Sequence, residues 1–367
     1  MTKLAQGFLW VIFSFLIVSC VSVAPRPPKS AHSLTFMTYN VENLFDTKQD
    51  ADREDYTFLP RAIKGTPQHR LNCSKLKGFR QQECLDTDWN ESILDRKLER
   101  LADVILSVNN GRGPDILILD EVENMNALQM LNKKLAAAKY QSVVLIEGPD
   151  LRGIDVGMLS RFPQARPAQL HPIAFQPKTP EDKEWMARSR NILHSAFKLP
   201  TGEIINVFGV HFPSQHNPTY WREQAIDFLN ALQAKLPATE LAIAGGDFNI
   251  SAEEDARTNL YRSRLQQKWL VSHYIGCGDC AGTHNYRGSW SFLDALLFSP
   301  NMGPGGTSRW QVDPKSIHVF KEGRYQTSRY MTPARFDENK PVGVSDHYPL
   351  LGEIVLREVI ETKKAEN

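Results

Sequence analysis

Eight polar residues suited to metal binding, proton transfer or phosphate binding occur at or near the ends of short apolar runs along this 367-residue sequence. The set contains four carboxylates, two amides and two imidazoles. They are Asn40, Glu121, His211, Asp247, Asn249, Asp294, Asp346 and His347. One such residue after a strand is more often a turn or helix cap than a catalyst. Six strand ends that all carry one are hard to explain as caps.

The chemistry of this set favours a metal-assisted reaction. A buried charge must be paired, hydrogen-bonded or bound to metal. Oxygen ligands suit a hard divalent cation, and the two imidazoles suit proton transfer and anion stabilisation. The residue types therefore predict a site that combines a divalent metal with an acid or base.

Strands and helices must bring these residues together. Apolar runs occur at residues 34–38, 116–119, 143–146, 204–212, 241–244 and 293–298, and most are continuous, as is typical of strands buried on both faces. Helical spacing places Leu94, Leu98, Leu101, Ile105 and Val108 on one stripe, and Trp221, Ala225, Phe228 and Leu232 on another. Together they predict an α/β sandwich with sheets covered by helices.

Six short motifs carry a resemblance to a known family. They read YNVEN at 39–43, DEVEN at 120–124, HFPS at 211–214, GDFN at 246–249, WSFLD at 290–294 and SDHYP at 345–349. In this order the chain resembles the endonuclease/exonuclease/phosphatase superfamily, which includes deoxyribonuclease I, over about residues 33–358. The resemblance implies a four-layer αββα sandwich: two packed, mostly antiparallel sheets flanked by helices. It also implies one domain, against the two that length alone suggests.

The resemblance implies a metal centre. It matches Glu121 and Asn40 to the family's metal-binding residues, which would hold Mg²⁺ or Mn²⁺ with Asp346 close by. Many family members carry Gln before the metal-binding Glu, whereas this chain has Asp120, and another acid, Glu123, follows two residues later. Glu121 is therefore preferred by alignment to the family rather than by its chemistry alone.

The resemblance also implies the residues that would carry the reaction. His347 would be the general base for the attacking water, oriented by Asp294. Asp247 and Asn249 would position the nucleophile and the phosphate, although some branches of the family use this Asp as the base. His211 would bind the scissile phosphate or protonate the leaving group.

Two arginines are further candidates for binding the substrate phosphate. Arg152 and Arg190 carry planar guanidinium groups that can bind phosphate through two hydrogen bonds. The alternative for each is a surface salt bridge.

The N-terminal residues predict export. Residues 8–19 form an uncharged apolar run, too short to span a bilayer comfortably and typical of a signal-peptide core, so residues 1–19 are interpreted as a signal peptide. Small residues before Cys20 resemble a bacterial lipobox, and residues 20–32 then form a lipidated Cys and a Pro-rich tether. An ordinary cleaved signal or a signal anchor is the alternative. We expect a protein anchored by lipid in the bacterial cell envelope, with the outer membrane favoured, or secreted.

Four cysteines remain after Cys20. We expect two local disulfides, Cys73–Cys84 and Cys277–Cys280, rather than a zinc site, because the spacings do not match two zinc-knuckle pairs. The first pair lies in a polar, loop-like insertion at about residues 50–90, and residues 359–367 are a charged, flexible tail.

Composition limits the function. Net charge is +1, with 41% hydrophobic and 23% charged residues, so the chain lacks the basic excess of a protein that coats DNA. The favoured function is a metal-dependent phosphodiesterase, an extracytoplasmic nuclease that acts as a monomer on nucleic acid. Two alternatives are a phospholipid phosphodiesterase or phosphomonoesterase on the same fold and, less favoured, a non-catalytic binding protein.

Overall fold

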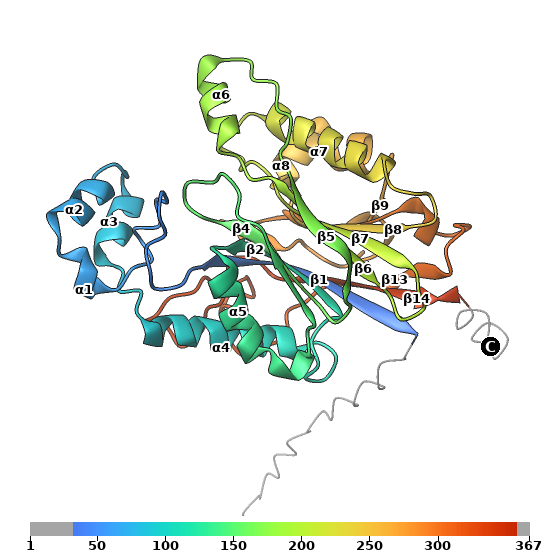
Figure 1. Ribbon diagram of the computed structural model, residues 1–367, viewed down its shortest axis with the longest axis horizontal. Coiled ribbons are helices and arrows are strands. Elements are labelled where there is room, and N and C mark those ends of the chain that lie inside the picture. The colour runs from blue at the N-terminus through green and yellow to red at the C-terminus, as the bar shows by residue number, and fades with distance from the viewer. Residues whose placement is uncertain (1–31, 358–367) are drawn as a thin grey trace, which may run out of the picture.

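The computed structural model describes residues 32–357, in which two six-stranded sheets pack face to face with helices on their outer faces (Figure 1). The predicted signal peptide, Cys20, most of the tether and the C-terminal tail lie outside these residues. Within residues 32–357, no helix combines the length and apolar character that crossing a bilayer would require.

The first sheet has the strand order β13-β14-β1-β2-β4-β3. Its strands are β1 (Ser33–Leu44), β2 (Ile116–Val122), β3 (Ser142–Leu145), β4 (Asp155–Ser160), β13 (Trp310–Val319) and β14 (Leu350–Leu356). Strands β1 and β2 are parallel, and every other neighbouring pair in this sheet is antiparallel. This sheet is called the first sheet below.

The second sheet repeats this plan in the order β5-β6-β7-β8-β12-β9. Its strands are β5 (Gln164–His171), β6 (Ile192–Lys198), β7 (Ile204–His211), β8 (Leu241–Asp247), β9 (Leu270–Val271) and β12 (Asp294–Phe298). Strands β7 and β8 form its only parallel pair. The expected pair of mostly antiparallel sheets is confirmed.

The side chains of β1 alternate between two apolar cores, which explains why the apolar run in its sequence is continuous. Phe36 belongs to the apolar core between the two sheets, together with Ile118 and Ile243. Met37 and Tyr39 point to the opposite face and join the core beneath the helices. Successive side chains of a strand point to opposite faces, so a strand covered on both sides needs apolar residues throughout.

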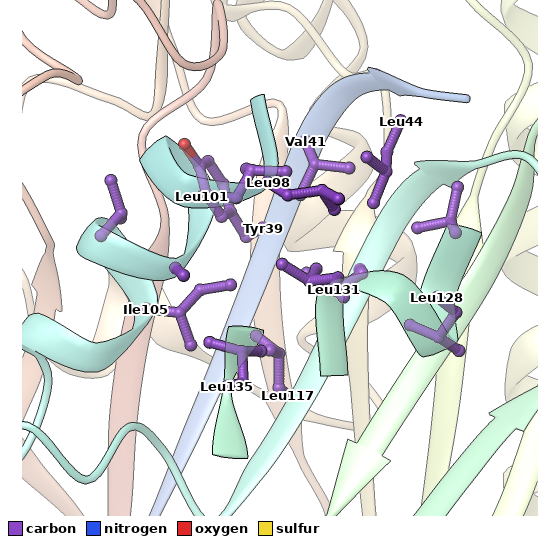
Figure 2. Close-up of a cluster of buried hydrophobic side chains, with 14 of the residues drawn as sticks. Tyr39, Val41, Leu44, Leu98, Leu101, Ile105, Leu117, Leu128, Leu131 and Leu135 are labelled. Atoms are coloured by element: carbon purple, nitrogen blue, oxygen red, sulfur yellow. The ribbon is translucent and has the colours of Figure 1, made fainter. Parts of the chain in front are cut away.

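Helices α4 (Glu91–Ser107) and α5 (Met125–Lys134) cover the outer face of the first sheet. Figure 2 shows the predicted leucine stripe of α4 and the leucines of α5 packed together against residues of β1 and β2. Helix α7 (Thr219–Ala234) packs on the second sheet through residues such as Ala225 and Leu229. Both predicted amphipathic helices are confirmed, and they complete the four layers.

The predicted loop insertion at residues 50–90 is only partly a loop. It contains three short helices, α1 (Arg61–Lys64), α2 (Pro67–Cys73) and α3 (Phe79–Asp86), which project from one end of the sheets (Figure 1). The Thr66 hydroxyl caps α2 by accepting a hydrogen bond from the His69 amide, and proline occupies its first turn. The Cys73–Cys84 disulfide then joins α2 to α3.

The Cys277–Cys280 disulfide also forms as expected. The remaining elements are short. They are α6 (Pro180–Ala187), α8 (Ala252–Thr258), a π-helical turn (Tyr261–Leu265), α9 (Ser272–Ile275), the hairpin strands β10 (His284–Tyr286) and β11 (Ser289–Ser291), and two 3₁₀ turns (Ala136–Ala138 and Pro300–Met302).

Candidate active site

The carboxyl ends of the two parallel strand pairs meet at one edge of the sandwich. In the first sheet Asn40 pairs in register with Asp120, and in the second His211 pairs with Asp247. The Asn40 side-chain amide lies 3.3 Å from a carboxylate oxygen of Glu121 and 3.3 Å from one of Asp247. Asn40 therefore joins the predicted residues of the two sheets.

A bulge in β2 separates the consecutive acids at its end. The register shifts between Asp120 and Val122, and Glu121 adopts a left-handed conformation with φ +64°. Asp120 turns into the core, where its carboxylate accepts a hydrogen bond of 2.9 Å from the Asp247 amide. Glu121 lines an open cavity at this edge of the sandwich, and its carboxylate accepts a hydrogen bond from the Asn43 amide at 3.0 Å. The bulge thus aims Glu121, and not Asp120, at the cavity.

Glu123, the other nearby acid, is directed away from Glu121. Its carboxylate accepts a hydrogen bond from the Asp46 amide at 2.7 Å, and burial raises its pKa to about 9. Glu123 does not line the cavity.

The turn after β8 places Asp247 and Asn249. The Asp247 carboxylate accepts a hydrogen bond from the Asn249 amide at 2.7 Å, and the Asn249 side chain donates to the Phe212 carbonyl at 3.1 Å. Gly246, with φ +140°, passes so close to β7 that a Cβ would lie 1.8 Å from the Val210 carbonyl oxygen. Only glycine permits this approach.

His347 and Asp294 form a close imidazole–carboxylate pair. His347 Nδ1 lies 2.7 Å from Asp294 Oδ2, and both side chains are buried. Burial lowers the His347 pKa, but the charge and hydrogen bond of Asp294, with the charges of Asp346 and Asp247, outweigh it, so the pKa is raised well above its usual value. Asp294 therefore sets the orientation of the ring and stabilises its protonated form.

The pKa of His211 is shifted in the opposite direction to that of His347. Its Nε2 lies 3.7 Å from Asp247 and 4.0 Å from Glu121, whereas its buried Nδ1 has no hydrogen-bond partner. Burial, together with the positive charges of Arg190 and Arg152, holds its pKa well below the usual value. His211 is therefore neutral near pH 7.

The two predicted arginines lie in different settings. Arg190 is ion-paired with Asp150 at 2.6 Å and donates hydrogen bonds to the carbonyls of His211 and Phe212. These contacts fix the end of β7. Arg152 lies 3.8 Å from the same Asp150, and its side chain is 49% exposed. Both line the cavity, and their binding of phosphate stays a prediction.

Asp346 lies beside His347 of the His347–Asp294 pair rather than beside Glu121. Its carboxylate is 3.9 Å from His347 Nε2 and 3.9 Å from the Arg335 guanidinium. Together with His347 and His284, which sequence reasoning missed, it forms one group of potential metal ligands within 4.8 Å of one another. No such geometric group in residues 32–357 combines Asp346 with Glu121.

One cavity of about 890 Å³ opens onto most of these residues. Its floor includes Glu121, His211, Asp247, Asn249 and His347. The walls add further residues outside the predicted set, among them His284, Trp185, Arg80 and Arg188. His284 lies in a short hairpin with no apolar signal. Arg80 and Trp185 lie on short helices far from any motif, and Arg188 directly follows α6.

The carboxylates at the floor fit a divalent cation. Within residues 32–357, the only basic side chain within ion-pair distance of Glu121 or Asp247 is that of His211, which is neutral. Burial raises the pKa of Asp247 to about 7 even though the charge of His347 lowers it. Buried carboxylates without a cationic partner are costly, and oxygen donors at one point suit Mg²⁺ or Mn²⁺.

Comparison with known proteins identifies the class. The model of the Endonuclease/Exonuclease/phosphatase family matches residues 79–356, about three quarters of the chain. The chain therefore belongs to this family of phosphoester hydrolases, whose members generally use divalent metal ions. No curated protein matches it.

Solved structures share the fold at low sequence identity. An endonuclease/exonuclease/phosphatase from Beutenbergia cavernae is 16% identical, with TM-score 0.53, and the match covers 89% of this chain and 72% of that one. A family protein from Bacteroides thetaiotaomicron is also 16% identical, with TM-score 0.51 and coverage of 88% and 98%. A humanized D. rerio TDP2 is 14% identical, with TM-score 0.52 and coverage of 88% and 98%.

Proposed function

We propose that this enzyme is a metal-dependent phosphodiesterase that hydrolyses nucleic acid. The observation that carries the proposal is that Glu121, Asp247 and His347 line one open cavity. The Asn40 amide lies within hydrogen-bond distance of Glu121 and Asp247, and Asp294 is bonded to His347. Hydrolysis of a phosphodiester needs a metal ligand set, a base for water and groups that hold the phosphate. The cavity offers candidates for all three.

Glu121 and Asn40 would hold Mg²⁺ or Mn²⁺, and Asp346 would add negative charge from the other side of His347. The bound ion would stabilise charge on the phosphoryl oxygens. Glu121 is suited to this role because the β2 bulge directs it into the cavity, while the Asn43 amide holds one of its oxygens.

His347 would act as the general base. Its Nδ1 is bound to Asp294, so the proton from the attacking water would be taken at Nε2. The imidazolium that forms is stabilised by the Asp294 charge, which is the reason for the raised pKa of His347. Efficient catalysis by this base therefore requires a pH at which an appreciable fraction of His347 is neutral.

Asp247, Asn249 and His211 would position the phosphate and the attacking water. Because His211 is neutral near pH 7, it would offer a hydrogen bond rather than a full positive charge. Arg190 would act as a positioning residue, since its guanidinium holds the carbonyl of His211.

Nucleic acid is the proposed substrate class because the cavity is open, polar and partly lined by arginine. The TDP2 neighbour supports the fold only. We also propose that the enzyme is exported and lipid-anchored, which rests on the sequence around Cys20. We further propose that it acts as a monomer and that residues 33–358 form one domain.

The test is hydrolysis by purified wild-type protein and the His347→Ala variant. The substrates are plasmid DNA, RNA, sphingomyelin and bis-p-nitrophenyl phosphate, with Mg²⁺ or Mn²⁺. We expect nucleic-acid cleavage that falls by roughly 10²–10⁴-fold in the variant, with an unchanged circular dichroism spectrum. His171→Ala, on edge strand β5, is the matched control. Full activity of His347→Ala would reject the mechanism, and cleavage of sphingomyelin alone would reject the substrate.

A further inference from the structure

The cavity extends well beyond the residues that would act on one phosphate. Its volume of about 890 Å³ is near the upper end of the range of ~300–1,000 Å³ that is typical of ligand pockets. The walls above the floor include residues of α3, of the turn around Arg152, of α6 and of the segment 213–218. Figure 1 shows α3 and α6 in two separate projections near the same end of the sheets. A substrate longer than one phosphodiester would contact both.

One wall carries two cations that are weakly engaged by the protein. Arg80, from α3, forms no ion pair or side-chain hydrogen bond within residues 32–357. Arg152 is half-exposed, and its nearest carboxylate contact, with Asp150, is 3.8 Å long. The charge of Arg80 also acts on Arg152, so the two lie near each other. Two like charges held at one cavity wall create a site for an anion.

The other arginines of the cavity are engaged by carboxylates. Arg190 is bound to Asp150 at 2.6 Å, and Arg188 is bound to Glu184 at 2.9 Å. Each of these two guanidinium groups is therefore already bound to a carboxylate. Arg80 and Arg152 are the cations of the cavity that remain available to a substrate phosphate.

The α6 wall presents an aromatic ring. Trp185 lines the cavity although 54% of it is exposed, and the Arg188 guanidinium lies 5.8 Å from its ring centroid. A capping box, in which Thr179 and Asp182 bond reciprocally, stabilises the first turn of this short helix. An exposed indole on a capped helix is a platform on which a nucleobase can stack.

The acidic residues of the walls limit which nucleic acid can bind. Glu54, Glu181 and Asp182 also line the cavity. A rigid duplex needs an extended positive surface, and these walls do not provide one. A single strand can bend, so that a phosphate reaches the two arginines while a base stacks on the ring.

We propose that Arg80, Arg152 and Trp185 form a subsite for unpaired nucleic acid beside the reacting centre. Arg80 and Arg152 bind a phosphate next to the scissile one, and Trp185 stacks an unpaired base. This inference rests on the proposed function, because it assigns the form of nucleic acid that the same site takes. It also gives the disulfide-linked insertion a role, since Arg80 reaches the cavity from α3.

The test compares three substrates: a single-stranded oligonucleotide, its duplex, and bis-p-nitrophenyl phosphate, which is too small to reach the subsite. Arg80→Gln and Trp185→Ala should each lower the ratio of kcat/KM for the single strand to that for the small ester by roughly 5- to 100-fold, mainly through KM. Arg80→Gln should also reduce the slope of log(kcat/KM) against log salt by about 0.7. Trp185→Ala should affect an oligonucleotide that is abasic next to the cleaved bond less than an intact one.

Matched controls are available on the same insertion. Arg70→Gln on α2 removes an exposed charge that does not line the cavity, and Phe79→Ala removes an exposed ring next to Arg80. Both should keep the wild-type ratio. An equal loss on the oligonucleotide and the small ester, or no loss on either, would overturn the subsite.

A binding measurement separates this inference from the proposed function. Fluorescence anisotropy with uncleaved single-stranded oligonucleotide is measured in the His347→Ala background. Weaker binding on adding Arg80→Gln supports the subsite. If wild-type protein cleaves single strands but the subsite variants behave as wild type, only the subsite fails. If wild-type protein neither binds nor cleaves nucleic acid, the proposed function fails as well.

Discussion

Each of the two sheets contributes part of the site from the carboxyl ends of a parallel strand pair. The backbone conformations that place the side chains differ between the sheets. Each has a parallel pair, β1–β2 or β7–β8, whose carboxyl ends carry polar residues. The first sheet delivers Asn40 and Glu121, the proposed metal ligands. The second delivers His211 and Asp247, and its strand β12 adds Asp294. The metal half thus comes from the first sheet, whereas the proton-transfer half joins Asp294 of the second sheet to His347, which precedes β14 of the first sheet.

The halves differ in how the backbone aims the side chains. The first sheet uses a bulge and places a glutamate at φ +64°, a conformation that is costly for a residue with a side chain. The second keeps its register and uses Gly246 where β8 approaches β7. The comparison indicates that the metal half accepts strain at a glutamate to expose its carboxylate. The second sheet uses close packing at Gly246, and its one left-handed site residue is Asn249 at φ +54°, a residue type that tolerates this conformation.

The largest expected effect tests the metal half. Glu121→Gln removes the negative charge that would bind the ion, so we expect kcat/KM to fall by at least roughly 10³-fold and Mg²⁺ or Mn²⁺ binding by calorimetry to be lost. Glu123→Gln, two residues further along, is the control, and it should retain both. Metal binding that survives in Glu121→Gln would contradict the assignment of the metal to the first sheet.

The next effect tests the proton-transfer half. Asp294→Asn keeps the shape of the side chain but removes the charge that stabilises protonated His347, so we expect kcat to fall by roughly 10²–10³-fold. The acidic limb of the pH–rate profile should move to lower pH, because the pKa of His347 drops when the Asp294 charge is lost. Metal affinity measured by calorimetry should remain near the wild-type value. A large loss of metal affinity would show that the two halves do not act separately.

Much of the fold was predictable because the central strands are covered on both faces. All six apolar runs are strands, and both helical stripes are helices. Several strands at or near the sheet edges were missed, although the edge strand β3 was predicted. The chain from Gln164 to His171 forms β5, but it is mostly exposed, polar and contains Pro167, as an edge strand can. Such a strand lacks the apolar signal on which the prediction depends.

The predicted site residues came from family motifs, and the structure brings most of them to one cavity. What the sequence did not reveal is where neighbouring acids point. Asp120 and Glu121 are adjacent, yet a bulge sends one into the core and the other into the cavity. Arg80 and Trp185 lie outside every motif, because only the tertiary fold brings α3 and α6 to the cavity.

A smaller effect tests the backbone difference between the halves. In Gly246→Ala, the new Cβ would meet the Val210 carbonyl at 1.8 Å, so we expect the free energy of unfolding to fall by about 2–4 kcal/mol. Glu121→Gly should change it by less than about 1 kcal/mol, since relief of the left-handed strain offsets the lost bond to the Asn43 amide. Urea denaturation measures both. Equal losses would show that the two halves rely on packing to the same degree.

The smallest expected effect is on the pH dependence of the free energy of unfolding. Its sign differs between a buried group of the first sheet and a buried group beside the second sheet. In the first sheet, burial raises the pKa of Asp155 to about 7. Beside the second sheet, burial lowers the pKa of His273 to about 4. Between pH ~4 and ~6.5 the unfolded chain ionises the aspartate and protonates the histidine while the folded protein does neither. Rising pH therefore lowers the stability through Asp155 and raises it through His273, and the two slopes oppose each other.

A single substitution of each group should reveal its contribution to the slope of the free energy of unfolding against pH. Asp155→Asn should make the free energy of unfolding rise more steeply with pH, by up to about 1.4 kcal/mol per pH unit, because the opposing group is gone. His273→Phe keeps the stacking on Phe292 and should change the slope by a similar amount in the opposite direction. Asp52→Asn, on the exposed surface, should leave the slope unchanged. Urea denaturation at half-unit steps from pH 4.5 to 6.5 measures the slopes, and changes of the same sign in the first two variants would refute this division between the sheets.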